Sequence, residues 1–139
     1  FQESTGEFQN RDSRGDKSII KAGGLHWTQA ANGMMHEEIP MIPGTDCYGL
    51  QMFIKLPKKN ELEEGRAFHL DPEDIPIYSQ PGVNLKILAG SFHGTESKLN
   101  EIHPKIDFFD IELSAGAKIP FSIKEENVTL IICLQGQIK

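Results

Sequence analysis

Long apolar runs and a surplus of basic residues are both missing from this sequence. No uninterrupted hydrophobic stretch in the 139 residues approaches the roughly 20 that a membrane-spanning helix needs, so we expect no membrane partner. The 14 lysines and arginines stand against 20 acidic residues, which gives a formal net charge of −6. Such a chain repels phosphate backbones, so the composition disfavours direct binding to nucleic acid.

Cysteine is scarce, and the two that are present lie in different settings. Cys133 lies in the apolar run "VTLIICLQG", which predicts a buried strand, and Cys47 follows the turn sequence "PGTD". One buried cysteine and one loop cysteine do not make a disulfide framework, which favours a reducing compartment. We therefore expect a cytoplasmic protein, or a nuclear one if the source is eukaryotic.

Helix signals are few, and alternation of apolar and polar residues takes their place. The 13 glycines and 8 prolines interrupt the chain, and period-two patterns occupy residues 48–56, 83–89 and 107–113. The run 128–134 is apolar on both faces. Short strands between Gly/Pro turns predict an all-β sandwich or barrel. Weak helix signals occur only at 58–66 and 71–76, and the second fits a single turn after Asp71.

The stretch from Leu56 to Ser79 is the longest segment without a clear pattern. Its prolines favour a stiff connection over a packed element. We expect it to join two similar β units, with the chain divided at 1–56, 57–80 and 81–139.

A histidine followed by two glutamates occurs in "GMMHEEIP". In a strand, His36 and Glu38 project to one face and Glu37 to the other. An imidazole nitrogen beside a carboxylate oxygen suits iron, manganese, nickel or zinc more than calcium. The alternative is a solvated strand end, and the pair alone does not decide. His26, between two apolar residues in "LHW", is a candidate third ligand or a hydrogen-bonded core residue.

Longer motifs carry a more specific signal. The stretches "RDSRGD", "GGLHWTQAANGMMHEEIP" and "YGLQMFIKLP" resemble, in order and spacing, the HxDSxGN, GDxQWMTAGxGIxHSE and GLQLWVNLP motifs of the pirin family of two-domain cupins. In the second half, "GVNLKILAG", "DFFDIELSAGAKIPFSI" and "TLIICLQGQI" resemble the opening strands of the second cupin domain. The resemblance implies two incomplete cupin (double-stranded β-helix, or jelly-roll) units: the end of an N-terminal cupin at 1–56, a linker at 57–80, and the start of a C-terminal cupin at 81–139.

The resemblance also implies a metal and an activity. The family holds one metal with three histidines and a glutamate, and its HSE stretch falls on His36 and Glu38. The implied cofactor is Fe²⁺, with another divalent metal or no metal as alternatives. The implied activity is that of a quercetin 2,3-dioxygenase with a flavonol substrate; catalytic residues stay unassigned.

Two departures from the family pattern make this function incomplete. The family's HPHRG motif, which carries the other two histidines, does not occur here, and Asn10 and His26 replace a histidine and a glutamine. The alternatives are a non-enzymatic co-regulator that binds other proteins and a truncated cupin without metal. A barrel that lacks strands leaves sheet edges and apolar faces uncovered, so we also expect self-association.

Overall fold

The computed structural model describes residues 6–138, and short strands make up nearly all of its regular structure. In chain order the elements are β1 (Phe8–Asp12), β2 (Lys17–Ile20), β3 (Leu25–Gln29), β4 (His36–Pro40), η1 (Lys58–Asn60), β5 (Arg66–Leu70), η2 (Pro72–Asp74), β6 (Ile77–Gln80), β7 (Val83–Ala89), β8 (Ser91–Phe92), β9 (Thr95–Glu96) and β10 (Phe108–Leu113). The all-β expectation is confirmed, and η2 is the single turn expected after Asp71. Within residues 6–138, the helical segments are too short to cross a membrane.

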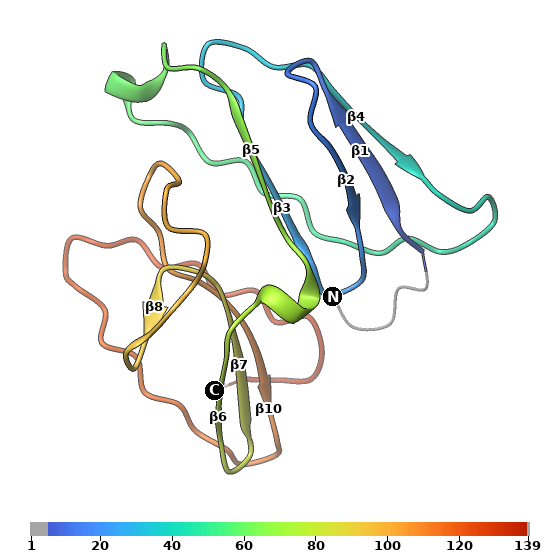
Figure 1. Cartoon of the computed structure of the whole chain (residues 1–139). Helices are drawn as coiled ribbons and strands as arrows, with labels where there is room; N and C mark the ends of the chain where they lie inside the picture. The colour runs from blue at the N-terminus through green and yellow to red at the C-terminus, as the bar shows by residue number, and fades with distance from the viewer. Residues whose placement is uncertain (1–5, 139) are drawn as a thin grey trace.

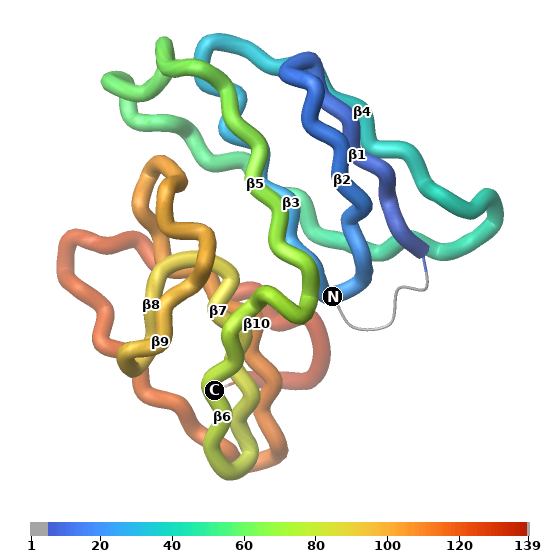
Figure 2. The backbone as a smooth tube through the Cα atoms, in the orientation of Figure 1, coloured from blue at the N-terminus to red at the C-terminus, as the bar shows by residue number. Residues whose placement is uncertain are grey.

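The strands form small antiparallel sheets in two halves of the molecule. One half holds the sheet β2-β1-β4 and the pair β3-β5, and the other holds the sheet β10-β7-β6 and the hairpin β8-β9 (Figure 1). The described strands do not close into a barrel. Figure 2 shows the long connection from β4 to β5, which makes a wide loop and then runs back toward η1.

Two hydrophobic clusters hold the second half together and join it to β3-β5. The larger is made of Leu70, Ile75, Leu88, Ala89, Leu99 and Ile102, with Trp27 and Phe68 among the side chains packed against it. The smaller is made of Leu85, Ile87 and Phe92. Strand β7 supplies both clusters, because its last residues are buried on either face. Its apolar, β-branched sequence suits this central position between β6 and β10.

The two-stranded sheet β3-β5 has one apolar and one polar face. Leu25 and Trp27 pair with Leu70 and Phe68, and these four side chains pack on the larger cluster. Alternation therefore turns the intervening pair, His26 and His69, to the other side, which faces the sheet β2-β1-β4. We call this side the histidine face.

Residues 57–80 are not an irregular connection. They contain β5, which pairs with β3, and β6, which pairs with β7, and they place Leu70 and Ile75 in the larger cluster. The prolines are compatible with these strands because Pro72 opens η2 and Pro76 precedes β6, positions where a missing N–H breaks no sheet ladder. The division at 1–56, 57–80 and 81–139 itself stays a prediction, and residues 1–5 lie outside the described part.

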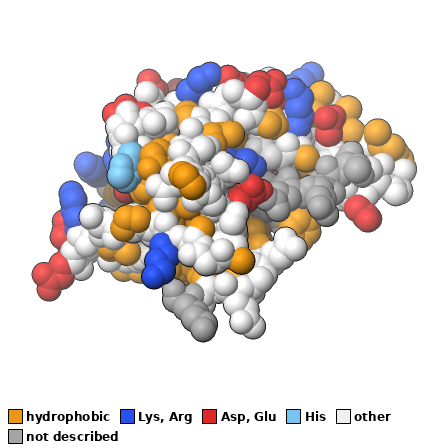
Figure 3. Space-filling model, turned by 90° about the horizontal axis from the view of Figure 1, so that it is seen from below, with side chains coloured by type: hydrophobic (Ala, Val, Ile, Leu, Met, Phe, Trp, Pro, Cys, Tyr) orange, Lys and Arg blue, Asp and Glu red, His pale blue; other side chains and the backbone are white. Residues whose placement is uncertain are grey.

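Two predicted strands are wrong for the described structure. Residues 48–56 and 128–134 form no strand, and most of their apolar side chains are exposed, up to 88% for Phe53 and 100% for Val128. A strand needs a neighbour for its backbone N–H and C=O groups, and neither segment has one here. Cys133 is exposed instead of buried, and both cysteines are free, as expected. Figure 3 shows hydrophobic side chains spread over one face of the molecule.

Candidate functional site

Strand β4 presents His36 and Glu38 on one face of its sheet. Its neighbour β1 pairs Asp12 with His36, Arg11 with Glu37 and Asn10 with Glu38. An ion pair of 3.7 Å between Arg11 Nε and Glu37 Oε1 marks the opposite face. These pairings agree with the predicted orientation, in which Glu37 projects to the opposite face from His36 and Glu38. We call the side that carries Asn10, Asp12, Ser18, His36 and Glu38 the donor face.

The donor face and the histidine face meet at a short polar contact. Ser18 lies beside Asn10 in the register of β1 and β2, and its Oγ is 3.4 Å from His26 Nδ1. None of the buried hydrophobic residues of the described chain comes from β1, β2 or β4. Polar side chains therefore make this contact between the two layers of strands.

Several polar atoms in this space are buried without a hydrogen-bond partner. They are both amide atoms of the Asn10 side chain, Asp12 Oδ2, His26 Nε2 and His69 Nδ1. Asn10 is completely buried. A buried polar atom without a partner costs about 1–3 kcal/mol, and native proteins keep few of them. Their concentration on these two facing layers indicates a place that binds a polar ligand.

The histidine pair is half-buried on the side of β3-β5 that faces the donor face. The ring centroids of His26 and His69 are 6.0 Å apart, with planes at 45°. Burial, together with the charges of His69 and His36, lowers the pKa of His26 to about 4 against a weaker opposing effect of Asp12 and Asp16. His26 is therefore neutral at pH 7, the form in which an imidazole binds a metal.

Local hydrogen bonds fix the start of β4 against the β1–β2 turn. Asp12 Oδ1 accepts hydrogen bonds from the backbone N–H groups of Arg14 and Asp16, at 2.8 and 3.1 Å. The next residue, Ser13, bonds to Met35 twice, through its backbone N–H at 2.8 Å and through its Oγ at 3.1 Å. These contacts set the position of His36 relative to Asp12.

The sequence-predicted ligands share this space but do not converge. His36 and Glu38 are exposed on the donor face, whereas His26 projects from the histidine face. Within residues 6–138, no group of three or more His, Cys, Asp or Glu side chains is arranged to hold a metal ion. The ligand roles of His36, Glu38 and His26 stay predictions.

The sequence reading missed His69, because it placed this residue in a linker. A signal was present: "FHL" at 68–70 repeats the apolar-His-apolar pattern of "LHW" at 25–27. In both places the flanking side chains anchor the strand in the core and turn the histidine to the polar side.

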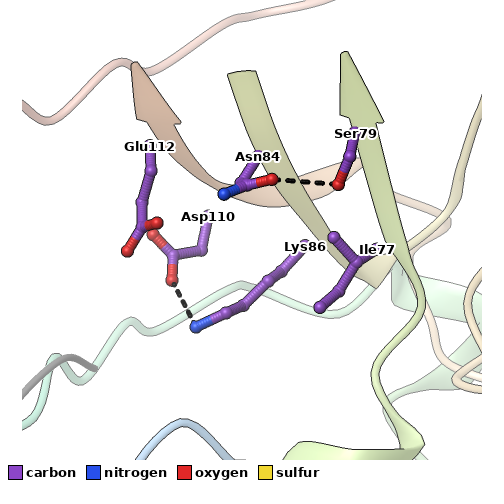
Figure 4. Close-up of a pocket in the computed structure, with 6 residues that line it drawn as sticks. All are labelled: Ile77, Ser79, Asn84, Lys86, Asp110 and Glu112. Carbon is purple, nitrogen blue, oxygen red and sulfur yellow. Dashed lines mark hydrogen bonds and ion pairs between the residues drawn. The ribbon is translucent and has the colours of Figure 1, made fainter. Parts of the chain in front are cut away.

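A separate hollow lies on the sheet of the second half. It measures about 200 Å³ and is lined by Ile77, Ser79, Asn84, Lys86, Asp110 and Glu112 (Figure 4). Most of its polar groups already pair with one another, Ser79 with Asn84 at 2.9 Å and Lys86 with Asp110 at 3.5 Å. Such internally paired groups leave little for a ligand to bind, so we place the candidate site on the donor and histidine faces.

Comparison with known proteins shows which family this sequence matches. The pirin family model matches residues 4–54, a stretch that includes His26, His36 and Glu38. A pirin-like protein from Solanum lycopersicum is 33% identical over 132 residues, which are 95% of this chain and 45% of that protein. The chain belongs to the pirin family. It spans less than half the length of the curated pirin relatives that it matches, between 43% and 48% for three of them.

Solved structures give the same assignment for the fold of this pirin-family chain. A protein from Geobacillus kaustophilus superposes with a TM-score of 0.74 at 25% identity, covering 81% of this chain and 44% of that one. A quercetin 2,3-dioxygenase from Acinetobacter baumannii superposes with a TM-score of 0.64 at 25% identity, covering 78% and 35% of the two chains. The fold is all-β and of the cupin type.

Proposed function

We propose that this chain supplies His36 and Glu38 as two ligands of the metal centre of a pirin-type dioxygenase, with Fe²⁺ as the metal and a flavonol such as quercetin as the substrate. The single observation that carries the proposal is the orientation of this pair. Strand β4 turns both side chains to the donor face, and the Arg11–Glu37 ion pair occupies the other face.

The surroundings of the pair support a ligand at this place. The donor face borders a space that holds five buried polar atoms without partners. Imidazole and carboxylate are the ligands that non-haem iron prefers. The residues fit half of a four-ligand set, because the HPHRG motif of the family does not occur in this sequence. The Acinetobacter baumannii structure named quercetin 2,3-dioxygenase supports the choice of reaction class.

The chain's own residues would bind and orient in this reaction. A divalent iron, when bound, supplies open coordination positions and Lewis acidity for oxygen chemistry. Glu38 would act as a ligand or accept a proton from the substrate hydroxyl, while His36 holds the geometry. Asn10, which pairs with Glu38 in the register of β1 and β4, is buried beneath the pair.

The test combines iron content with quercetin turnover under air. Because the residues fit half of the ligand set, we expect weak iron binding and slow quercetin consumption after addition of Fe²⁺. The variants His36→Ala and Glu38→Ala should each lower the iron content and the rate of quercetin consumption at least tenfold further. His93→Asn serves as the control, because His93 stacks on Tyr78 in the other half and its φ of 47° suits asparagine. Turnover that survives both alanine variants would refute the assignment.

A second function, association with another protein, is favoured by the exposed apolar side chains. Most of them lie in two segments that form no strands, residues 41–53 and 121–138. Monomeric proteins seldom expose contiguous apolar patches of several hundred Å². We propose a second copy of this chain as the partner, and sedimentation at micromolar concentration distinguishes a dimer from a monomer.

A further inference from the structure

We infer that residues 128–134, "VTLIICL", form the contact between two copies of this chain, as a pair of antiparallel strands related by a two-fold axis at Ile131. This inference rests on the proposed association with a second copy. It goes further because it names the segment that pairs, the direction of the two strands and the residues that lie opposite each other.

The segment has a strand-forming sequence and no strand beside it. Five of its seven residues are Val, Leu or Ile, and Thr129 is also β-branched. Within residues 6–138, the segment belongs to no sheet, and its backbone groups take no part in the backbone hydrogen bonds of loops and turns. Unpaired N–H and C=O groups of this kind recruit another strand.

The side chains of the segment are apolar on both faces and lie open to solvent. In a strand, Val128, Leu130, Ile132 and Leu134 would share one face, and Thr129, Ile131 and Cys133 the other. The five aliphatic side chains are each more than half exposed. Cys133 is exposed and free as well. A partner strand therefore needs apolar side chains on both of its faces.

A second copy of the segment meets this requirement better than the rest of the same chain. Residues 48–56 also form no strand, and they leave residues 128–134 unpaired. The sheets of the described chain have edges at β4 and β10, which carry the acidic side chains Glu38 and Glu112. Pairing with either edge would place aliphatic side chains beside a carboxylate, whereas pairing with another copy of residues 128–134 would not.

Charge favours the antiparallel direction. Glu125 and Glu126 come shortly before the segment. In a parallel pair with matched register, each glutamate would lie beside its own copy, and like charges opposite each other are destabilising. In an antiparallel pair centred on Ile131, the two glutamates lie beside residues 136 and 137 of the other copy, which are uncharged. This centre also pairs all seven residues of the segment, and it gives a closed two-fold dimer.

The exposed apolar surface is large enough for a dimer. Eight large apolar side chains are exposed within residues 121–138. Together they offer on the order of 1,000 Å² per copy, and a stable interface takes about 800 Å² from each partner. A two-stranded ribbon is marginal unless one of its faces packs on further apolar surface. Residues 41–53 provide that surface, with Phe53 exposed by 88%.

The test measures the register with disulfides, in chains that carry Cys47→Ser and keep Cys133. In the variant Thr129→Cys, the new thiol lies opposite Cys133 of the other copy, within reach of a disulfide. Oxidation with diamide should therefore give a covalent dimer on a non-reducing gel. Val128→Cys is the matched control, because its thiol projects to the other face. We expect at least about tenfold more covalent dimer from Thr129→Cys than from Val128→Cys.

A second measurement uses no new thiol. Ile131→Arg places two like charges together at the two-fold axis, and it should weaken the dimer at least about tenfold in sedimentation at micromolar concentration. Leu62→Arg is the control, because Leu62 is 88% exposed and lies outside the proposed contact. It should sediment as the parent does. Circular dichroism verifies that each variant is folded.

The outcomes separate this inference from the proposed association. If the parent sediments as a dimer but Thr129→Cys forms no more covalent dimer than Val128→Cys, the association stands and the inference is wrong. A dimer that Ile131→Arg leaves unchanged meets through another surface, which also overturns the inference. A parent that is a monomer refutes both, and protection of the amides of residues 128–134 from hydrogen exchange in that monomer would identify a partner strand within the same chain.

Discussion

Replacing Asn10 with leucine should stabilise the fold, although Asn10 is a completely buried residue. Both amide atoms of its side chain lack a hydrogen-bond partner. Leucine has the same number of side-chain heavy atoms and no polar group, so Asn10→Leu removes the unpaired atoms while it fills the same place. Most substitutions of a buried residue lower stability, so a gain in stability would point specifically to the removal of the unpaired atoms.

The magnitude follows from the cost of buried polar atoms. Each unpaired group costs about 1–3 kcal/mol, and the two costs are not additive because they belong to one amide. Leucine is larger than asparagine, and overpacking takes back about 1 kcal/mol. We expect a net gain of about 1–2 kcal/mol in the free energy of unfolding, which corresponds to a rise of roughly 3–8 °C in Tm for a chain of this size.

A matched control is provided by Gln29, another buried amide. Its Oε1 accepts a hydrogen bond of 2.9 Å from the backbone N–H of His103, so this amide is partnered. Gln29→Met keeps the length of the side chain but leaves that N–H unpaired, and it should lower stability by about 1–3 kcal/mol. Urea denaturation measures whether each variant has a higher or a lower free energy of unfolding than the parent. If Asn10→Leu is destabilising like Gln29→Met, Asn10 is satisfied in solution and the reasoning from unpaired atoms fails.

Three further predictions concern the core, a turn and the exposed segments. Ile87→Ala should cost about 2–5 kcal/mol in urea denaturation because Ile87 is fully buried, whereas Ile77→Ala, at an exposed position, should cost less than about 1 kcal/mol. Gly90→Ala should lower the free energy of unfolding by at least about 1 kcal/mol more than Gly94→Ala. Both glycines have a positive φ, but only a Cβ at position 90 would meet Asp107 and the Ile106 carbonyl. Equal losses of stability in thermal unfolding would contradict this. The double variant Leu130→Ser, Ile132→Ser should sediment as a smaller species than the parent at micromolar concentration, because both side chains are exposed in the parent, and an unchanged profile would show that this segment is no contact surface.

Alternation in the sequence identified strands where neighbours exist to pair with them. Residues 83–89 and 107–113 were predicted as strands, and they form β7 and β10, which pair with each other. The same pattern failed at 48–56 and 128–134, which have no strand beside them in the described chain. Period-two alternation indicates which side chains would share a face. Whether another strand lies alongside to bond to the backbone depends on the whole fold.

The candidate site was predictable in the same partial way. The orientation of His36 and Glu38 follows from their spacing alone, and the register of β1 and β4 agrees with it. The pairing of His26 with His69 does not follow, because register between strands that are distant in the sequence is set by the packing of Trp27 and Phe68 against a common core. Prolines near His69 also hid a strand that forms between them.

The late position of β5 in the chain has a consequence for how such proteins evolve. The strand that completes the histidine face comes after the long β4–β5 connection, and its Phe68 and Leu70 fill the core behind His26. A recombination event at Pro57 would exchange the second half of the gene together with this strand. Such an event would separate His26 from His69, whereas an exchange after Leu70 would keep the two paired strands together.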